Sequence, residues 1–352
     1  MFLAVTGGGT GGHVYPALEV ARLARERGHE LLYLGSLRGQ EGPACEHEGI
    51  SFVGFPSAPL ASLRTLDGWR SLTALLRARA MAKTALRVDR PSVLFSTGGY
   101  SAAPVVSAAR ALSIPYGLFE ANSVPGRSNS LYARQARAVA TVFRGTEARF
   151  PGSRVVRTGL PIRREVRLAA QNRTEGTPTV FVVGGSQGSR FLNEAVPAAA
   201  RALARPGLRW LHVAGRAHFH EVSERAEGIA NYQVEPYLDG DAMANAYRSA
   251  TVLVGRSGSI LAEVALFGIP SVLVPLPTAA GDHQTENAQE FVAMGAAILH
   301  LQATSTPERL ASDIAGWLDD AATRAAAGQA LASFDVPDAT DRILALLEEA
   351  AR

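Results

Sequence analysis

Short apolar runs alternate with longer amphipathic stretches through the first half of the chain. The short runs predict β-strands at 2–5, 30–34, 51–54, 92–96, 116–119 and 138–142. The amphipathic stretches predict helices at 16–27, 60–86 and 102–112. Strands that alternate with helices in this way are typical of a parallel, doubly wound sheet with helices on both faces.

The same alternation restarts after a polar, charged stretch at 163–177. Strands are predicted at 180–183, 210–213, 252–254 and 271–274, and helices at 191–204, 243–250, 260–267, 287–294, 307–318 and 339–351. Each half opens with a strand, a glycine-rich loop and a helix. The sequence therefore predicts an α/β protein with two Rossmann-like, doubly wound parallel-sheet domains that face each other across a cleft.

The turn Gly159-Leu160-Pro161 ahead of the polar stretch sets the predicted domain boundaries. We predict an N-terminal domain at 1–160, a linker at 161–178 and a second domain at 179–335. A C-terminal helix at 336–352 follows, with packing against the N-terminal domain as one option. Ligands of open α/β sheets bind beyond the carboxyl ends of the strands, where both glycine loops are expected to lie.

Composition narrows the class of protein. The 352 residues are 47% hydrophobic and 19% charged, which favours a large core over disorder. The single cysteine, Cys45, excludes an intramolecular disulfide framework and suits a reducing compartment. We expect no signal peptide, because the N-terminus lacks a basic region, and no apolar run reaches the roughly 18 residues of a membrane span. A net charge of +3 gives no reason to expect a nucleic-acid partner.

The first glycine loop, Thr6–Pro16, holds five glycines between a predicted strand and a predicted helix. Free N–H groups at a helix N-terminus favour an anion such as phosphate. His13 is the one side chain of this loop whose ordinary pKa lies near neutral pH. A dinucleotide site would also need an acid at the tip of the second strand, which here ends Leu34-Gly35-Ser36. An anionic ligand with a single nucleoside fits better.

A second cluster of polar residues lies at 255–263 and 282–287. Ser257 and Ser259 are placed to cap a helix and to offer N–H groups to phosphate. Glu263, one turn further on, suits the two hydroxyls of a ribose. Gln284 and Asn287 are three residues apart and so share a helix face, where their amides suit sugar hydroxyls. Together these residues predict a nucleotide-sugar site, with helix caps and a solvated polar face as the alternative.

Ordered motifs run along nearly the whole chain, at 8–16, 97–101, 120–126, 159–163, 184–188, 242–244, 256–263 and 283–287. In this order they resemble the MurG family of glycosyltransferases, glycosyltransferase family 28. The resemblance implies the GT-B fold, with the donor mainly on the C-terminal domain. It also implies an inverting transfer of N-acetylglucosamine from UDP-N-acetylglucosamine to the 4-hydroxyl of undecaprenyl-pyrophosphoryl-N-acetylmuramyl-pentapeptide, in peptidoglycan synthesis.

Carried over motif by motif, the resemblance implies donor-binding residues in both domains. From the N-terminal side these are Thr10, Gly11, Gly12 and Asn122. From the C-terminal side they are Arg163, Gly185, Ser186, Gln187, Leu238, Ser259, Ile260, Leu261, Glu263, Gln284 and Asn287. The chain departs from the family pattern at 119–122, at Leu160, at 239–242 and at 256–263, which affects the expected loop contacts.

Inverting transfer needs a base for the acceptor hydroxyl and a group that offsets charge on departing UDP. His13 is the candidate base, because an unperturbed histidine titrates near neutral pH. A role for His13 in orienting the loop, with Glu120 as the base, is the alternative. Helix N-termini after Ser186 and Ser257, together with Arg163, would meet the leaving-group charge, so we expect no metal and no other cofactor. Asp239-Gly240-Asp241 resembles a metal-binding acidic pair but lies in a turn.

The stretch 60–87 is the candidate membrane-binding segment. Its basic residues, Arg64, Arg70, Arg77, Arg79, Lys83 and Arg87, outnumber the single acid Asp67 and accompany Trp69 and several leucines. Such a helix suits an anionic surface, which predicts a peripheral protein at the cytoplasmic face of the plasma membrane. The alternative is an ordinary amphipathic helix packed on the sheet. Two rival functions stay open: a UDP-N-acetylglucosamine 2-epimerase on the same fold, and a non-catalytic nucleotide-sugar-binding or adaptor protein.

Overall fold

Two units make up the computed structural model, which describes residues 1–57, 65–171, 176–185 and 187–352. The first unit contains Met1–Ile162 together with Val336–Arg352, and the second contains Arg163–Asp335. The chain thus leaves the first unit once and returns to it for its last helix. No helix in the described part of the chain combines the length and the apolar character that spanning a bilayer requires.

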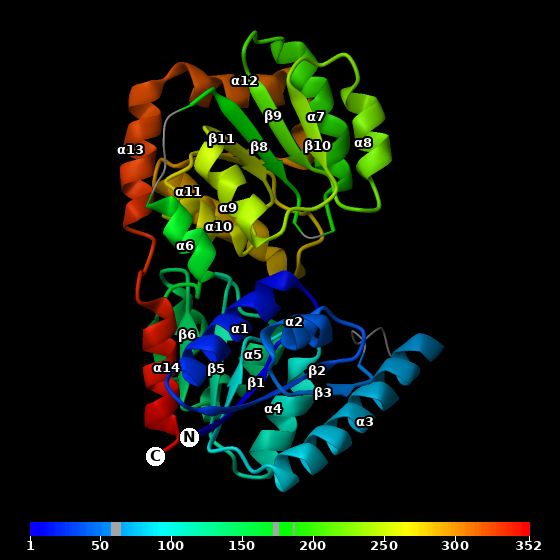
Figure 1. Ribbon diagram of the computed structural model, residues 1–352, viewed down its shortest axis with the longest axis vertical. Coiled ribbons are helices and arrows are strands. Elements are labelled where there is room, and N and C mark those ends of the chain that lie inside the picture. The colour runs from blue at the N-terminus through cyan, green and yellow to red at the C-terminus, as the bar shows by residue number, and fades with distance from the viewer. Residues whose placement is uncertain (58–64, 172–175, 186) are drawn as a thin grey trace. The chain divides into compact units, whose positions relative to one another are not determined.

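The first unit is built on a seven-stranded, fully parallel sheet (Figure 1). The strand order is β3-β2-β1-β4-β5-β6-β7, so the direction of winding reverses between β1 and β4. Every residue of β4 and β5 is buried, as expected for strands with helices on both faces. The strands are β1 (Phe2–Thr6), β2 (Glu30–Ser36), β3 (Phe52–Phe55), β4 (Val93–Ser96), β5 (Tyr116–Glu120), β6 (Ala138–Thr141) and β7 (Val155–Arg157).

The helices of the first unit cover both faces of this sheet. They are α1 (Gly11–Glu26), α2 (Glu41–Glu48), α3 (Leu66–Val88), α4 (Ala102–Ala111), α5 (Arg127–Tyr132) and α14 (Ala339–Ala350), with 3-10 turns η1 (Ala133–Gln135) and η2 (Thr146–Arg149). Helix α14 packs on α1, β4 and β5 through Ile343, Leu344 and Leu347. Helix α3 lies along α4, and its N-terminal part extends past the edge strand β3 (Figure 1).

The second unit repeats the architecture with a six-stranded parallel sheet of order β10-β9-β8-β11-β12-β13. Its winding reverses between β8 and β11. The strands are β8 (Thr179–Val183), β9 (Arg209–Val213), β10 (Tyr232–Glu235), β11 (Val252–Gly255), β12 (Ser271–Leu273) and β13 (Ala297–Leu299). The helices are α6 (Arg164–Ala170), α7 (Arg190–Leu203), α8 (Phe219–Ala226), α9 (Gly240–Ser249), α10 (Ile260–Leu266), α11 (His283–Ala293), α12 (Pro307–Asp319) and α13 (Ala321–Ala332), with η3 (Ala280–Asp282) and η4 (Gln302–Thr304).

The predicted α/β class with two doubly wound parallel sheets is confirmed. The polar stretch after residue 162 differs from expectation, because α6 forms there, buries Val166 and packs on α9 within the second unit. The helix expected to begin near residue 60 has its N-cap at Thr65, whose hydroxyl accepts from the Gly68 N–H. Residues 58–64 lie outside the described part of the chain.

Candidate functional site

The first glycine loop lies where the winding of the first sheet reverses, which is the usual ligand position in open α/β sheets. Helix α1 begins inside the loop, at Gly11, with Thr10 as its N-cap. The Thr10 side chain is exposed and makes no capping hydrogen bond. Gly11 is buried and Gly12 is half-buried. The first turn of α1 therefore offers backbone N–H groups to a ligand.

His13, in that first turn, is held by two hydrogen bonds to one residue. Its Nδ1 lies 2.7 Å from the carbonyl oxygen of Thr97, and the Thr97 hydroxyl donates to the His13 carbonyl at 2.7 Å. A carbonyl oxygen accepts only, so Nδ1 carries the proton and Nε2 of the neutral ring has the free lone pair. The contact thus fixes both the orientation and the tautomer of a half-buried imidazole.

Glu120, at the end of β5, is buried and fully engaged. Its carboxylate accepts from the backbone N–H groups of Asn122 and Gly126 at 3.1 and 2.9 Å. It also accepts from the side-chain amides of Asn122 and Asn129 at 3.2 and 2.9 Å. Four donors around one carboxylate hold it in place and organise the loop after β5. This arrangement argues against the alternative that Glu120 is the base, and it ties the Asn122 amide to the loop.

The second glycine loop follows β8, again at the point where the winding reverses. Gly188 has φ +77°, and a Cβ there would lie 2.0 Å from the Ala214 carbonyl oxygen, so only glycine fits. Ser189 caps α7 by accepting from the Leu192 N–H. Gly185 and Gln187 are exposed at the loop surface, and the predicted site residue Ser186 lies outside the described residues.

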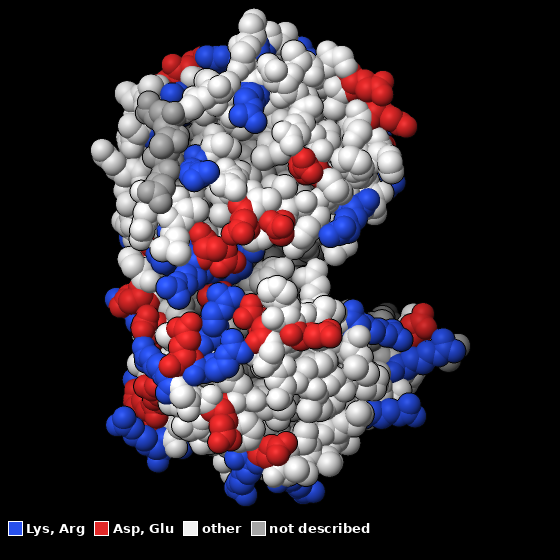
Figure 2. All heavy atoms as spheres, in the orientation of Figure 1, with Lys and Arg blue, Asp and Glu red and all other residues white. Residues whose placement is uncertain are grey.

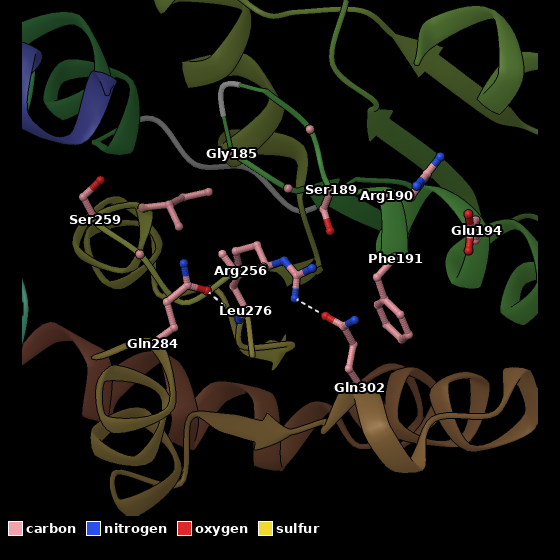
Figure 3. A pocket seen from close by; sticks show the side chains of 14 residues that line it. Gly185, Ser189, Arg190, Phe191, Glu194, Arg256, Ser259, Leu276, Gln284 and Gln302 are labelled. Carbon is pink, nitrogen blue, oxygen red and sulfur yellow. Dashed lines mark hydrogen bonds between the residues drawn. The ribbon is translucent and has the colours of Figure 1, made fainter. Parts of the chain in front are cut away.

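A cavity of about 540 Å³ opens in front of this loop (Figure 3). Four of the predicted site residues, Gly185, Ser259, Ile260 and Gln284, line it. The N-terminus of α7 and the loop after β11 form opposite walls. The sequence assigns no ligand role to five lining residues, namely Arg190, Phe191, Glu194, Leu276 and Gln302, and it places a sixth, Arg256, in the predicted cluster at 255–263 without a role of its own.

Arg256, directly after β11, places a guanidinium group in the cavity wall. Its Nη1 donates to the carbonyl oxygens of Val274 and Pro275, both at 2.9 Å, and to Oε1 of Gln302 at 2.8 Å (Figure 3). Burial lowers the pKa of Arg256 to about 10, which leaves it cationic at neutral pH. All three acceptors are uncharged, so the cavity carries a fixed positive charge. In the sequence, the signal for a role of Arg256 is its place directly before Ser257-Gly258-Ser259.

Gln284 and Asn287 share a face of α11 as predicted from spacing, but they differ in burial. Gln284 lines the cavity, where its Oε1 accepts from the Leu276 N–H at 2.9 Å. Asn287 is fully buried, and its amide donates to the Ser257 carbonyl at 2.9 Å. The Ser257 hydroxyl donates to the Gln284 carbonyl at 2.6 Å instead of capping α10. Asn287 therefore supports the loop as a buried anchor, and the ligand contact predicted for it stays a prediction.

Glu263 lies in α10, between Tyr247 of α9 and Arg163. The Tyr247 hydroxyl donates to Glu263 Oε2 at 2.6 Å, and Arg163 Nη2 lies 3.6 Å from Oε1. Neighbouring Leu261 is fully buried, so its side chain belongs to the core, and the donor contact predicted for this residue stays a prediction. Leu238, between β10 and α9, is half-buried.

The acidic pair at 239–241 has a structural explanation. Asp239 is the N-cap of α9, and its Oδ1 accepts from the Ala242 N–H at 2.9 Å. Within the described residues, no group of three or more His, Cys, Asp or Glu side chains is arranged to hold a metal ion. The resemblance of this pair to a metal site is thus explained by helix capping.

Helix α3 presents two different faces. Ala78, Ala82 and Leu86 are buried against the first unit, as an amphipathic core helix requires. The outer face exposes Trp69 by 58% and Leu76 by 57%. Arginine and lysine side chains gather over the projecting part of this helix (Figure 2). The buried face fits an ordinary amphipathic helix packed on the sheet, and membrane binding by the outer face stays a prediction.

Comparison with known proteins decides the family. Sequence models of the family 28 N-terminal and C-terminal domains match residues 3–141 and 179–343. A UDP-N-acetylglucosamine–N-acetylmuramyl-(pentapeptide) pyrophosphoryl-undecaprenol N-acetylglucosamine transferase of Halorhodospira halophila is 40% identical over 99% of this chain and 98% of its own. The chain belongs to glycosyltransferase family 28.

A second relative and a solved structure support the same family. The enzyme with the same name from Halalkalibacterium halodurans is 34% identical over the full length of both chains. The crystal structure of Acinetobacter baumannii MurG is 28% identical, covers 99% of both chains and has a TM-score of 0.79. A Listeria monocytogenes protein assigned as a UDP-N-acetylglucosamine 2-epimerase reaches a TM-score of 0.72 at 13% identity, which shows a shared fold alone.

Proposed function

We propose that this family 28 enzyme transfers N-acetylglucosamine from UDP-N-acetylglucosamine to the 4-hydroxyl of undecaprenyl-pyrophosphoryl-N-acetylmuramyl-pentapeptide. The full-length similarity to curated transferases with these substrates in their names carries the proposal. The cavity beside the second glycine loop supports it, because N–H groups and a fixed cation suit a nucleoside diphosphate. The enzyme would act at the cytoplasmic face of the plasma membrane, where such a lipid-linked acceptor is accessible.

In the proposed reaction, Nε2 of His13 accepts the proton of the acceptor 4-hydroxyl. The hydroxyl oxygen attacks the anomeric carbon from the face opposite UDP and forms the new glycosidic bond. The bond from that carbon to the phosphate oxygen breaks, and UDP leaves with the electron pair. One displacement inverts an α-linked donor to a β-linked product, through a transition state with oxocarbenium character. The contact from Thr97 supports this role, because it holds the proton on Nδ1.

Groups of the second unit would stabilise the negative charge that develops on departing UDP. The glycine loop with Gly185 and Gln187 and the N-terminus of α7 would donate to the diphosphate, and Arg256 and Arg163 would add positive charge. We propose that these groups take the place of a divalent metal. Glu263 would accept from the ribose hydroxyls, Gln284 from the sugar, and the backbone near Leu238 would meet the uracil.

The test is release of UDP from UDP-N-acetylglucosamine in detergent, with and without the lipid-linked acceptor and with EDTA throughout. We expect release that depends on acceptor and is unaffected by EDTA. In parallel, formation of the C2-inverted nucleotide sugar without acceptor is measured. Inversion without acceptor-dependent release would favour an epimerase, and donor binding without either reaction would favour a binding protein.

The outer face of α3 is proposed to bind an anionic membrane surface. Removing two of its charges with Arg70→Gln and Arg77→Gln should weaken binding to vesicles that contain anionic lipid by roughly 10- to 30-fold, at about 1 kcal/mol per basic residue. Vesicle co-sedimentation measures the effect. Removing two exposed charges elsewhere, with Arg225→Gln and Arg342→Gln, should leave binding within about twofold of the wild type. Equal losses in both variants would contradict a specific surface on α3.

A further inference from the structure

The carboxylate of Glu263 is held by two side chains from different elements. Tyr247 of α9 donates to Oε2 at 2.6 Å, and Arg163, at the start of α6, lies 3.6 Å from Oε1. Burial, followed by the neighbouring carboxylate, raises the pKa of Tyr247 well above its ordinary value. The tyrosine hydroxyl therefore stays protonated and acts as the donor in this pair.

Tyr247 itself has no freedom to move. Its ring is fully buried, packs edge-on against Phe181 with centroids 5.5 Å apart, and lies tilted by 31° against Phe267 at 5.3 Å. A hydroxyl on such a ring holds its acceptor at a fixed place. Loss of the hydroxyl alone would leave the packing of the ring intact.

An ionised carboxylate has about four positions at which it accepts hydrogen bonds. Tyr247 occupies one on Oε2, and Arg163 faces Oε1. Each oxygen of Glu263 thus keeps a lone pair for one further donor. Two oxygens with one free position each match the adjacent 2′- and 3′-hydroxyls of a ribose.

We propose that Tyr247 is a positioning residue that fixes Glu263 for the ribose diol and so sets the preference for ribonucleotide over 2′-deoxyribonucleotide donors. The inference rests on the proposed function, which assigns Glu263 to the ribose. Without the tyrosine hydroxyl, the carboxylate turns toward Arg163 and forms a closer ion pair. Oε2, which Tyr247 holds in the wild type, then leaves the position at which it would accept from the 2′-hydroxyl.

The test compares UDP-N-acetylglucosamine with its 2′-deoxyribose analogue in wild type and Tyr247→Phe. We expect the variant to raise KM for the ribose donor about tenfold, the scale of one hydrogen bond, with kcat within about twofold. KM for the deoxy donor should change by less than about threefold, so the preference between the donors falls several-fold. Tyr116→Phe removes a buried hydroxyl that donates to the Tyr132 carbonyl in the first unit, and it should leave the preference unchanged.

Calorimetric binding of UDP and 2′-deoxy-UDP to the same variants separates this inference from the proposed reaction, because binding needs no transfer. A lower UDP preference in Tyr247→Phe supports the inference even if no transfer is found. Equal weakening of both nucleotides would mean that Tyr247 has only a structural role. A wild type that does not distinguish the two nucleotides would also overturn the inference, since Glu263 would then not contact the 2′-hydroxyl.

Discussion

His13→Asn is expected to lower kcat for acceptor-dependent UDP release by about 10²- to 10⁴-fold, the range of a lost general base. The asparagine amide can still donate to the Thr97 carbonyl, as Nδ1 does at 2.7 Å. What it lacks is an acceptor at the position of Nε2. The substitution therefore removes the proposed base while it keeps the contact that orders the loop. UDP release in detergent with EDTA measures the effect.

Two comparisons make this result specific. His47→Asn changes an exposed histidine of the same unit and should leave kcat within about twofold of the wild type. KM for UDP-N-acetylglucosamine should change little in His13→Asn, because the nucleotide cavity lies in the second unit. If His13→Asn keeps more than a tenth of the wild-type kcat, the base lies elsewhere and His13 serves only to order the loop.

Much of the fold follows from the chain's apolar pattern, because a strand buried on both faces is a continuous apolar run. Strands β8 and β11 are buried at every position, and the sequence located both. It missed β7, β10 and β13, which are short edge strands with half-exposed residues. An edge strand is specified by pairing with its neighbour, so its own sequence carries little signal.

The candidate site, like the fold, could be predicted from the sequence only in part. Glycine loops between a strand and a helix locate the ligand-binding ends of both sheets, because a few neighbouring residues are enough to recognise such a loop. The residues that pair through their side chains, by contrast, are far apart in the sequence. His13 and Thr97 are 84 residues apart, and Arg256 and Gln302 are 46 apart. Helical spacing placed Gln284 and Asn287 on one face but gave no means of telling which amide is buried. That difference depends on the packing of α11 against the loop at 257.

A buried histidine should make the stability of the second unit depend on pH. His212 of β9 lies within 2.8 Å of the Tyr232 hydroxyl through Nδ1 and 3.1 Å of Asn193 Oδ1 through Nε2. The Asn193 amide donates to the Ala214 carbonyl, so Oδ1 faces the histidine and accepts from Nε2. Tyr232 then donates to Nδ1, and a second proton on the ring would break that bond. Burial lowers the pKa of His212 to about 3.

The direction in which stability changes with pH follows from proton binding by the folded and the unfolded chain. Below about pH 6.5, the ordinary histidine pKa, the unfolded chain binds a proton at His212, whereas the folded protein does not until about pH 3. The free energy of unfolding therefore falls as pH falls, by up to about 1.4 kcal/mol per pH unit. Between pH 7.5 and 4.5 this single group should cost about 2 to 3 kcal/mol of stability, roughly a hundredfold in the folding equilibrium.

Urea unfolding of wild type and His212→Gln at pH 7.5, 6.5, 5.5 and 4.5 tests this expectation. Both carry Trp69→Phe, so that fluorescence from Trp210 and Trp317 reports on the second unit alone. His212→Gln should be less stable at pH 7.5 yet lose about 2 to 3 kcal/mol less than the wild type by pH 4.5. Titrating groups common to both proteins cancel in this difference, and exposed His220→Gln should follow the wild-type curve. Parallel curves for wild type and His212→Gln would mean that the imidazole is protonated as readily in the folded unit as in the unfolded chain.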